Sequence, residues 1–368
     1  MRVLVLGGTA WLGWTVALES RARGHEVTCA ARGSEGPPEG VTFVRVDRDD
    51  EAGLTSASGL AGRWAAVVDV SRQPGQMRRA VRDLDTDHWV FVSTSNVYAR
   101  FDAVDQCEKA PRRPPLVGDV LTDMESYGEA KVACEDTVAD GAVITSTIVR
   151  SGLIGGPGDT SGRTGYWPWR FAHPAGMSTL SEDARTVPAV VVPDDLTFPC
   201  AVIDVRDLAA WIVTADERHL DGVFNATGPT ITLGEVLTAA AHVAQSAAHR
   251  HPVGAENLRG LGIQGWMGPA SLPLWIDDPD WRGFATLDTT PARAAGLTTR
   301  PLADTLRDAL AYEETRTADN PRRAGLSDDD ERRALEATVP EATVPEATVP
   351  EATVPEATVP EAAVIENS

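Results

Sequence analysis

Short runs of apolar residues alternate with stretches of helical hydrophobic spacing along most of this chain. The first run, Arg2 to Leu6, is mostly aliphatic and β-branched, which is the composition of a strand buried on both faces. Further runs of this kind predict strands at residues 26–30, 41–46, 64–70, 88–93, 143–149, 201–205 and 222–226. Helical spacing lies between them, including residues 78–84, 127–138, 207–213 and 233–244. Strands that alternate with helices predict parallel pairing through crossover connections, so we expect an α/β fold with a doubly wound parallel sheet of the Rossmann type.

This pattern changes along the chain and predicts three regions. Residues 1–160 are expected to form a dinucleotide-binding domain, with later segments such as residues 201–226 returning to it. Residues 161–325 contain aromatic and proline-rich loops, including Tyr166-Trp167-Pro168-Trp169, and predict a smaller C-terminal substrate-binding lobe. Residues 326–368 are expected to form an acidic tail.

The expected tail contains a short repeat. Residues 336–360 are five copies of Glu-Ala-Thr-Val-Pro. Proline at every fifth position prevents a continuous helix and blocks the hydrogen bonds of a sheet. The period is also too short for the unit of a solenoid. We therefore predict that the tail is extended and disordered, and that neither folding nor turnover depends on it.

Composition narrows the functional class. The formal net charge is −21, of which residues 326–368 contribute −9 through eleven acidic residues and two arginines. The rest of the chain has a net charge of −12. Neither part offers the basic face that nucleic acids need, so we expect no nucleic-acid partner. No apolar run reaches the ~18 residues of a membrane span and no signal segment opens the chain, which predicts a cytoplasmic protein without a membrane partner. The four cysteines and seven histidines show no metal-ligand spacing, so we expect neither disulfides nor a metal site.

A glycine-rich turn follows the first predicted strand. Gly7 and Gly8 end the strand, and Gly13 completes a G-x-x-G-x-x-G spacing whose middle position is Ala10. Glycine allows a tight turn and a close approach of helix and strand, while the amides and dipole at the helix start favour a pyrophosphate. Such turns also occur without a ligand, but the position directly after an N-terminal strand favours dinucleotide binding. The expected cofactor contacts on this turn are Gly7, Thr9, Ala10, Trp11, Leu12 and Gly13.

The ends of the second and third predicted strands bear on which dinucleotide binds. A dinucleotide fold commonly places an acidic residue at the end of the second strand to bind the adenosine ribose, but here Ala31 and Arg32 stand there. A guanidinium pairs well with a 2′-phosphate, so NADP is favoured over NAD; a solvated loop arginine is the alternative. Asp47, after the third strand, is expected to accept a hydrogen bond from the adenine amino group, with Arg48 as a further cofactor contact.

A tyrosine and a lysine at helical spacing form the candidate catalytic pair. Tyr127 and Lys131 are four residues apart, so they share one face of a predicted helix. A nearby ammonium stabilises phenolate and lowers the tyrosine pKa from about 10, which suits Tyr127 to proton exchange at a substrate oxygen. Thr94, at the end of the fifth predicted strand, is placed to hydrogen-bond the same oxygen. The pair alone also arises by chance, and it is the combination with the glycine turn and Thr94 that favours a catalytic site.

These motifs resemble the extended short-chain dehydrogenase/reductase superfamily, of the NAD-dependent epimerase/dehydratase type. The resemblance covers roughly residues 1–315. It implies that Thr94, four residues before Tyr98, is the active-site threonine, that Tyr127 is the catalytic tyrosine, and that Lys131 also holds the nicotinamide ribose. It rests on Asp47 and on residues 7–13 (GGTAWLG), 93–98 (STSNVY), 127–131 (YGEAK), 150–159 (RSGLIGGPGD) and 203–209 (IDVRDLA).

Three departures from the family pattern bear on the substrate. Dehydratases of this family carry Asp-Glu directly after the active-site threonine, whereas this chain has Ser95-Asn96, which argues against sugar 4,6-dehydration. Members that act on nucleotide sugars often place a diphosphate-binding arginine four residues before the position of Asp204, where this chain has Cys200. Ser151 replaces the usual proline in the loop on the nicotinamide side.

We therefore expect an NADP(H)-dependent oxidoreductase, of carbonyl reductase or alcohol dehydrogenase type, that acts on a small non-nucleotide metabolite. Besides the catalytic residues, Asn96, Tyr166 and Trp169 are expected to contact this substrate. An epimerase with transient oxidation by tightly bound NAD(P) uses the same residues and is the alternative. A non-catalytic NADP-binding sensor or an RNA-binding relative is a further alternative, disfavoured by the presence of Tyr127 and Lys131. The chain is expected to be a monomer or a homodimer.

Overall fold

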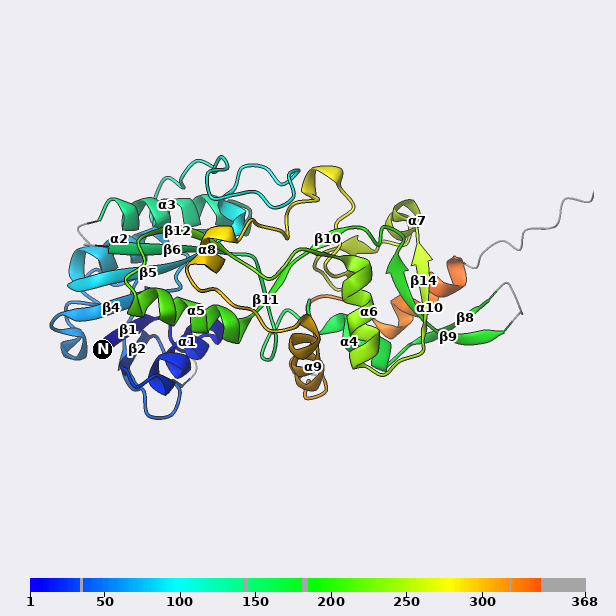
Figure 1. The fold of residues 1–368 in the computed structure, drawn as a ribbon, viewed down its shortest axis with the longest axis horizontal. Coiled ribbons are helices and arrows are strands. Elements are labelled where there is room, and N and C mark those ends of the chain that lie inside the picture. The colour runs from blue at the N-terminus through cyan, green and yellow to red at the C-terminus, as the bar shows by residue number, and fades with distance from the viewer. Residues whose placement is uncertain (34–35, 142–144, 181–184, 318, 339–368) are drawn as a thin grey trace, which may run out of the picture.

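A seven-stranded parallel sheet forms the centre of the first of two lobes (Figure 1). The computed structural model describes residues 1–33, 36–141, 145–180, 185–317 and 319–338. All neighbouring strands of this sheet are parallel. Their order is β12 (Gly222–Ala226), β6 (Thr145–Ser151), β5 (Thr86–Thr94), β4 (Trp64–Asp69), β1 (Arg2–Leu6), β2 (Glu26–Ala31) and β3 (Thr42–Arg45). The expected doubly wound α/β fold is confirmed.

Helices cover both faces of this sheet. On one face α1 (Trp11–Ala22) packs against α5 (Val205–Glu217), and on the other α2 (Pro74–Asp83) packs against α3 (Tyr127–Ala139) (Figure 1). In β1, Val3 and Val5 belong to the core beneath α1 and α5, whereas Leu4 and Leu6 belong to the core beneath α2 and α3. The strand is continuously apolar because both of its faces are covered.

The predicted strand at residues 201–205 is the one that the main sheet does not contain. Instead, β10 (Pro199–Cys200) pairs with β13 (Ile231–Thr232), and β11 (Val202–Asp204) pairs with β7 (Leu153–Gly155). The run ends early because the Asp204 carboxylate accepts a hydrogen bond from the Arg206 N–H at 2.9 Å and caps α5. The chain then re-enters the first lobe through α5 and β12.

The second lobe is built on a three-stranded sheet (Figure 1). In this sheet β9 (Thr186–Pro193) lies between β14 (His249–Val253), to which it is parallel, and the antiparallel β8 (Gly176–Thr179). The helices of this lobe are α4 (Tyr166–Ala172), α6 (Leu233–Val243), α7 (Ala255–Gly260), α9 (Leu302–Glu313) and α10 (Asp328–Ala337). Smaller elements are α8 (Thr290–Ala294) against β12, the pair β15 (Gln264–Gly265) and β16 (Ser271–Leu272), and 3₁₀ turns at Ser58–Leu60, Ser95–Val97, Met124–Ser126 and Pro279–Trp281.

Two expectations for this lobe were wrong. Tyr166-Trp167-Pro168-Trp169 is the start of helix α4 and not a loop. Pro168 is tolerated because it falls in the first turn, where a backbone N–H has no acceptor within the helix. The acidic tail does not begin at residue 326, because Ser327 caps α10 and Ala334 and Leu335 are buried in the core of the lobe.

The predicted disorder of the tail concerns residues 339–368, which lie outside the described residues. Glu336 and Ala337, the first residues of the repeat, are the last residues of α10. Within the described ranges, no helix combines the length and the apolar character needed to cross a membrane.

Candidate active site

The glycine turn between β1 and α1 is closed tightly. Gly7 has a φ of +85°, in the left-handed region that favours glycine, and its N–H donates to the Ala30 carbonyl oxygen at 3.0 Å. A Cβ atom on Gly13 would lie 2.4 Å from the Gly7 carbonyl oxygen, and one on Gly8 would lie 2.3 Å from Cys29 Sγ. The start of α1 therefore lies directly on the turn. These residues fit the pyrophosphate of a dinucleotide, which needs close backbone approach at a helix start.

Trp11 links this turn to a loop from far along the chain. Its indole Nε1 donates a hydrogen bond to the Pro157 carbonyl oxygen at 2.8 Å. Gly158 lets the loop come close, since a Cβ atom there would lie 2.8 Å from the same Nε1. The other expected contacts on the turn are the buried Thr9, the exposed Ala10 and the partly buried Leu12.

Arg32 and Asp47 lie beyond the carboxyl ends of the neighbouring strands β2 and β3. Both side chains are exposed. Asp47 Oδ1 accepts a hydrogen bond from the Asp49 N–H at 3.0 Å, which fixes the local turn. This edge of the sheet is where a Rossmann-type fold receives the adenosine half of a dinucleotide, so both residues remain predicted contacts.

Arg48 does not lie at this exposed edge, contrary to the prediction. Its guanidinium is buried and donates two hydrogen bonds to the Asp69 carboxylate, at 3.0 and 2.7 Å. A third bond reaches the Gln76 carbonyl oxygen at 3.1 Å. Arg48 therefore neutralises a completely buried carboxylate at the end of β4. The place of Arg48 next to Asp47 in the sequence could not show this, because its partner Asp69 lies on another strand.

Thr94, Asn96 and Tyr127 line one cavity of about 260 Å³. Thr94 ends β5 and Tyr127 begins α3, so the sheet edge and a helix start bring them together. Thr94 Oγ1 accepts hydrogen bonds from the backbone N–H of Asn96 at 3.3 Å and from its side-chain nitrogen at 3.1 Å. Because both bonds use the oxygen as acceptor, the Thr94 hydroxyl hydrogen is free to donate to a substrate oxygen.

Lys131 lies one helical turn after Tyr127 and is 3% exposed. Its ammonium donates to the carbonyl oxygens of Ser71 and Val92, at 2.7 and 2.6 Å, which lie beyond the end of β4 and near the end of β5. It also lies 4.5 Å from the ring centroid of Phe91. An ammonium has three donors, so one N–H remains for a further acceptor. The two carbonyl bonds fix the charge close to the helix start that carries Tyr127.

A buried polar network lies beside Thr94, and the sequence analysis did not predict it. Glu135 of α3 accepts hydrogen bonds from Ser93 Oγ at 2.6 Å and from the Arg150 guanidinium at 3.0 and 2.8 Å. Arg150 also donates to the Tyr98 hydroxyl at 3.2 Å, and that hydroxyl donates to Asn225 Oδ1 at 2.6 Å. Burial raises the pKa of Tyr98. The network joins α3 to β5, β6 and β12, and no local pattern in the sequence marks it, because its members lie far apart along the chain.

Tyr166 and Trp169 do not line the cavity of Thr94 and Tyr127, which corrects their expected contact with substrate. Tyr166 is completely buried in the core of the second lobe, edge-on to Trp167 with ring centroids 4.9 Å apart. This burial raises the pKa of its hydroxyl. Trp169 stacks against the Arg322 guanidinium, 3.7 Å from the ring centroid. Aromatic composition did not distinguish a core from a substrate wall.

Besides Trp11 and Tyr127, the aromatic residues that line the cavity come from later in the chain. Trp266 and Phe284 lie on its wall, together with Arg163 from the loop before α4. Trp266 has a φ of +67°, which is uncommon for a bulky residue. No motif in the sequence marks these three positions, and the tertiary fold alone brings them to Tyr127.

The two single-residue departures from the family pattern lie in different surroundings. Ser151 lines the cavity of Thr94 and Tyr127 and donates a hydrogen bond to the Ser93 carbonyl oxygen at 3.1 Å. Cys200 is buried, and its thiol donates to the Leu274 carbonyl oxygen at 3.3 Å. Burial raises the pKa of this thiol to about 12, so it stays neutral and cannot replace an arginine.

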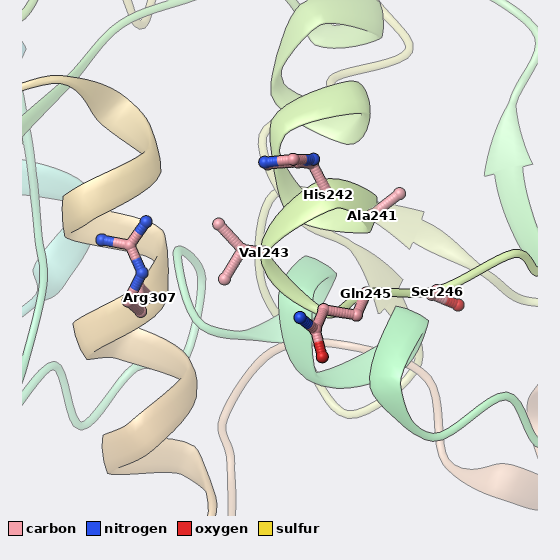
Figure 2. Close-up of a pocket in the computed structure, with 6 residues that line it drawn as sticks. All are labelled: Ala241, His242, Val243, Gln245, Ser246 and Arg307. Carbon is pink, nitrogen blue, oxygen red and sulfur yellow. The ribbon is translucent and has the colours of Figure 1, made fainter.

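A separate surface hollow of about 350 Å³ lies on the second lobe (Figure 2). It is formed by the carboxyl end of α6 and by α9, and Val243 points from α6 towards α9 (Figure 2). Arg307, on the α9 side, pairs with Asp304 at 2.6 Å. None of the predicted site residues lines this hollow, so it is separate from the cavity of Thr94 and Tyr127.

No protein-family model matches this chain, and no curated protein matches its sequence. Solved structures do match its fold. The UDP-glucose 4-epimerase of Thermus thermophilus, in complex with NAD, superposes with a TM-score of 0.59 at 19% identity, over 86% of this chain and 100% of that chain. The chain has the fold of this epimerase. The fold implied by the resemblance to the extended short-chain dehydrogenase/reductase superfamily is thereby confirmed.

Two further epimerases superpose equally well. The UDP-N-acetylglucosamine 4-epimerase of Bacillus cereus has a TM-score of 0.58 at 15% identity, over 86% of this chain and 98% of that chain. The UDP-glucose-4-epimerase of Stenotrophomonas maltophila, with bound NAD and formylated UDP-arabinopyranose, has a TM-score of 0.58 at 18% identity, over 85% and 98%. At these identities the likeness concerns the fold, and the chemistry must be argued from the site.

Proposed function

We propose that this protein is an NAD(P)-dependent enzyme that acts at a carbon–oxygen centre of a small molecule. The observation that carries the proposal is the meeting of Thr94 and Tyr127 in one cavity, at the same sheet edge as a glycine turn that fits a pyrophosphate. When bound, the nicotinamide supplies the hydride acceptor or donor. The residues of the chain then bind, orient and exchange a proton with the substrate.

Three side chains divide this work. The Tyr127 hydroxyl exchanges a proton with the substrate oxygen, and the Thr94 hydroxyl donates a hydrogen bond to that same oxygen. Lys131 places a buried ammonium one helical turn after Tyr127. Its remaining N–H is available to a ribose hydroxyl of the cofactor, the role that the family resemblance implies.

Epimerisation with transient oxidation is the outcome with more support, because the structures of this fold named above are epimerases. Net carbonyl reduction or alcohol oxidation is the second candidate, since the same three residues serve it. Nucleotide sugars, which those epimerases act on, are not carried over to this chain. Cys200 is a buried neutral thiol where the family's diphosphate-binding arginine is expected, which supports a non-nucleotide metabolite for either reaction.

The choice between NADP and NAD rests on the adenosine edge of the sheet. The exposed Arg32 beyond β2 supports NADP, because its guanidinium suits a 2′-phosphate and no acidic residue stands at the end of the strand. Two of the similar structures hold NAD. The cofactor test therefore compares both dinucleotides on the same protein.

The decisive experiment uses the full-length protein. Nucleotide released from it by acid identifies any dinucleotide that copurifies, and titration gives the affinities for NAD and NADP. The protein saturated with dinucleotide is then incubated with chiral hydroxy and oxo metabolites. Nicotinamide absorbance follows net hydride transfer, and chiral chromatography follows inversion without net transfer.

We expect the wild-type protein to invert a stereocentre of one of these metabolites. Tyr127→Phe should abolish this inversion. Net transfer that Tyr127→Phe abolishes would establish the second candidate instead. A wild-type protein that binds dinucleotide but performs neither reaction overturns the enzymatic proposal and favours a non-catalytic sensor.

A further inference from the structure

Arg163 lines the catalytic cavity without an acidic partner. Its Nε donates to Ser161 Oγ at 3.1 Å, and its guanidinium lies 5.3 Å from the ring centroid of Trp266. In the parts of the chain that the structure describes, no carboxylate forms an ion pair with it, and its two terminal nitrogens make no hydrogen bond. By contrast, Arg316 and Arg322 nearby both pair with Glu313, at 2.7 Å each.

The loop that carries Arg163 also contains Asp159, whose carboxylate accepts its hydrogen bonds from residues of the same loop. Asp159 Oδ1 accepts from the Ser161 N–H at 2.9 Å and from its hydroxyl at 2.6 Å, while Oδ2 accepts from Thr164 Oγ1 at 3.2 Å. Gly162, with a φ of +75°, turns the chain between these residues. Asp159 therefore shapes the loop, and the outer edge of the guanidinium remains available to a ligand.

The lining of the cavity contains one positive charge that belongs to no ion pair, although the Asp159 carboxylate of the same loop partly offsets it. No aspartate or glutamate lies among its lining residues in the described ranges, although the whole chain has a net charge of −21. Burial lowers the pKa of Arg163 because the cation is partly removed from water. An anionic ligand group would compensate this cost, which the Trp266 ring does only in part.

Aromatic side chains beside Arg163 line both the cavity and a second, adjoining hollow. Trp266 and Phe284 stand edge to face with ring centroids 4.9 Å apart. Both also line an adjoining hollow of about 550 Å³, in which Trp281 lies 5.1 Å from Phe284. The arginine that lines this hollow, Arg259, is paired with Asp277 at 2.8 Å. The hollow therefore offers apolar contact, and the charge of its arginine is already matched.

We propose that the substrate is a small monocarboxylate with an apolar or aromatic body. Arg163 holds the carboxylate, Trp266 and Phe284 contact the body, and the reacting hydroxyl or carbonyl meets Thr94 and Tyr127. This inference rests on the proposed function, because it places the substrate in the same cavity.

Charge and size support this class. A guanidinium presents parallel N–H groups that match the two oxygens of one carboxylate. One unpaired cation matches one negative charge, whereas a nucleoside diphosphate has at least two. At about 260 Å³ the cavity lies just below the range of about 300–1,000 Å³ that is common for drug-sized ligands, so the group held beside Tyr127 is small.

The test measures binding, so that it does not depend on turnover. Calorimetric titration of the full-length protein, saturated with its dinucleotide, compares phenylacetate with phenylacetamide, which has nearly the same shape and no charge. We expect the acid to bind about 10- to 100-fold more tightly than the amide, as for a charge-assisted contact. In Arg163→Gln the acid should bind no more tightly than the amide. In Arg163→Lys the acid should still bind more tightly, by a smaller factor. Arg259→Gln, a change to an arginine that already has a partner, should leave it unchanged.

The outcomes separate this inference from the proposed function. An acid-to-amide ratio near one in the wild type, absence of phenylacetate binding at millimolar concentration, or a ratio that persists in Arg163→Gln would each overturn the carboxylate site. Should Arg163→Gln fail to fold, the wild-type ratio and Arg163→Lys still decide. If the acid-to-amide binding ratio is as expected but no metabolite reacts in any screen, the carboxylate site stands. Only the proposed function is then overturned.

Discussion

Arg170 Nε lies 3.0 Å from Glu331 Oε2, and both side chains are completely buried. Arg170 belongs to α4 and also donates to the Leu326 carbonyl oxygen at 2.7 Å and to the Asp328 carboxylate at 2.8 Å. Glu331 belongs to α10 and accepts from the Val191 N–H of β9 at 3.0 Å. This pair anchors the last described helix to the second lobe.

Truncation should therefore separate α10 from the repeat. A chain that ends at Thr338 keeps α10 and should melt at the temperature of the full-length protein. A chain that ends at Leu326 loses both acidic partners of Arg170 and uncovers apolar core, so we expect it to be destabilised by about 3–5 kcal/mol or more. Thermal and urea unfolding measure both differences.

Two point variants refine this prediction. Burial raises the pKa of Glu331 to about 7, so above that pH Glu331→Gln keeps the shape of the side chain but leaves the Arg170 charge without its buried partner, and should also cost about 3–5 kcal/mol. Asp329→Asn, at a position 90% exposed in the same helix turn, should change stability by less than about 0.5 kcal/mol. Equal effects of the two variants would contradict the anchoring role of α10.

Tyr127 and Tyr98 provide a matched pair for the chemistry. Tyr127→Phe removes only the hydroxyl that lines the cavity, so turnover should be lost while dinucleotide affinity and stability stay nearly unchanged. Tyr98→Phe removes a buried hydroxyl bonded to Asn225 at 2.6 Å, so stability should fall by about 1–3 kcal/mol while the folded protein keeps turnover. Steady-state kinetics and urea unfolding distinguish the two. Near-normal turnover of Tyr127→Phe would contradict its role as the proton-exchanging group.

Arg32 should determine the preference for the 2′-phosphate. Arg32→Ala is expected to weaken NADP binding by about 1.5–3 kcal/mol, the value of a charge-assisted hydrogen bond, and to leave NAD binding unchanged. Arg45→Ala, at an exposed arginine that ends the neighbouring strand β3, is the control and should affect neither. Titration of both dinucleotides provides the measurement. Tighter binding of NAD than of NADP to the wild type would contradict the prediction.

Asp216 should make stability depend on pH. Its carboxyl is 1% exposed, and burial, together with the nearby Glu217, raises its pKa to about 7. The folded protein therefore keeps a proton that the unfolded chain loses near pH 4, so stability falls between about pH 4 and pH 7 and is level above that. At about 1.4 kcal/mol per pKa unit, this loss amounts to about 4 kcal/mol.

Asp216→Asn should remove the contribution of Asp216 to this dependence and leave that of Glu331, whose pKa burial also raises to about 7. The variant is expected to be more stable than the wild type above about pH 7 and similar to it near pH 4, because asparagine resembles the protonated acid. Asp140→Asn, at an exposed carboxyl after α3, is the control. Urea unfolding across this pH range gives the comparison, and a difference that does not change with pH would contradict the assignment.

Short-range physics explains which parts of this protein the sequence predicts. A strand covered on both faces must be apolar at every position, as β1 is, and a turn that a Cβ atom would obstruct must be glycine, as at Gly7 and Gly13. Tyr127 and Lys131 share a helix face because of helical geometry alone. The fold class, the glycine turn and this pair therefore follow from residues close together in the sequence.

Other features depend on partners that are distant in the sequence. Arg48 is held by Asp69, Tyr166 is enclosed by the second lobe, and Arg163 meets Trp266 and Tyr127 only after both lobes have formed. An arginine, a tyrosine or a tryptophan has the same local pattern whether it binds a ligand, fills a core or neutralises a carboxylate. The tertiary structure alone decides among these roles, because only there is it settled which charges are paired and which surfaces are removed from water.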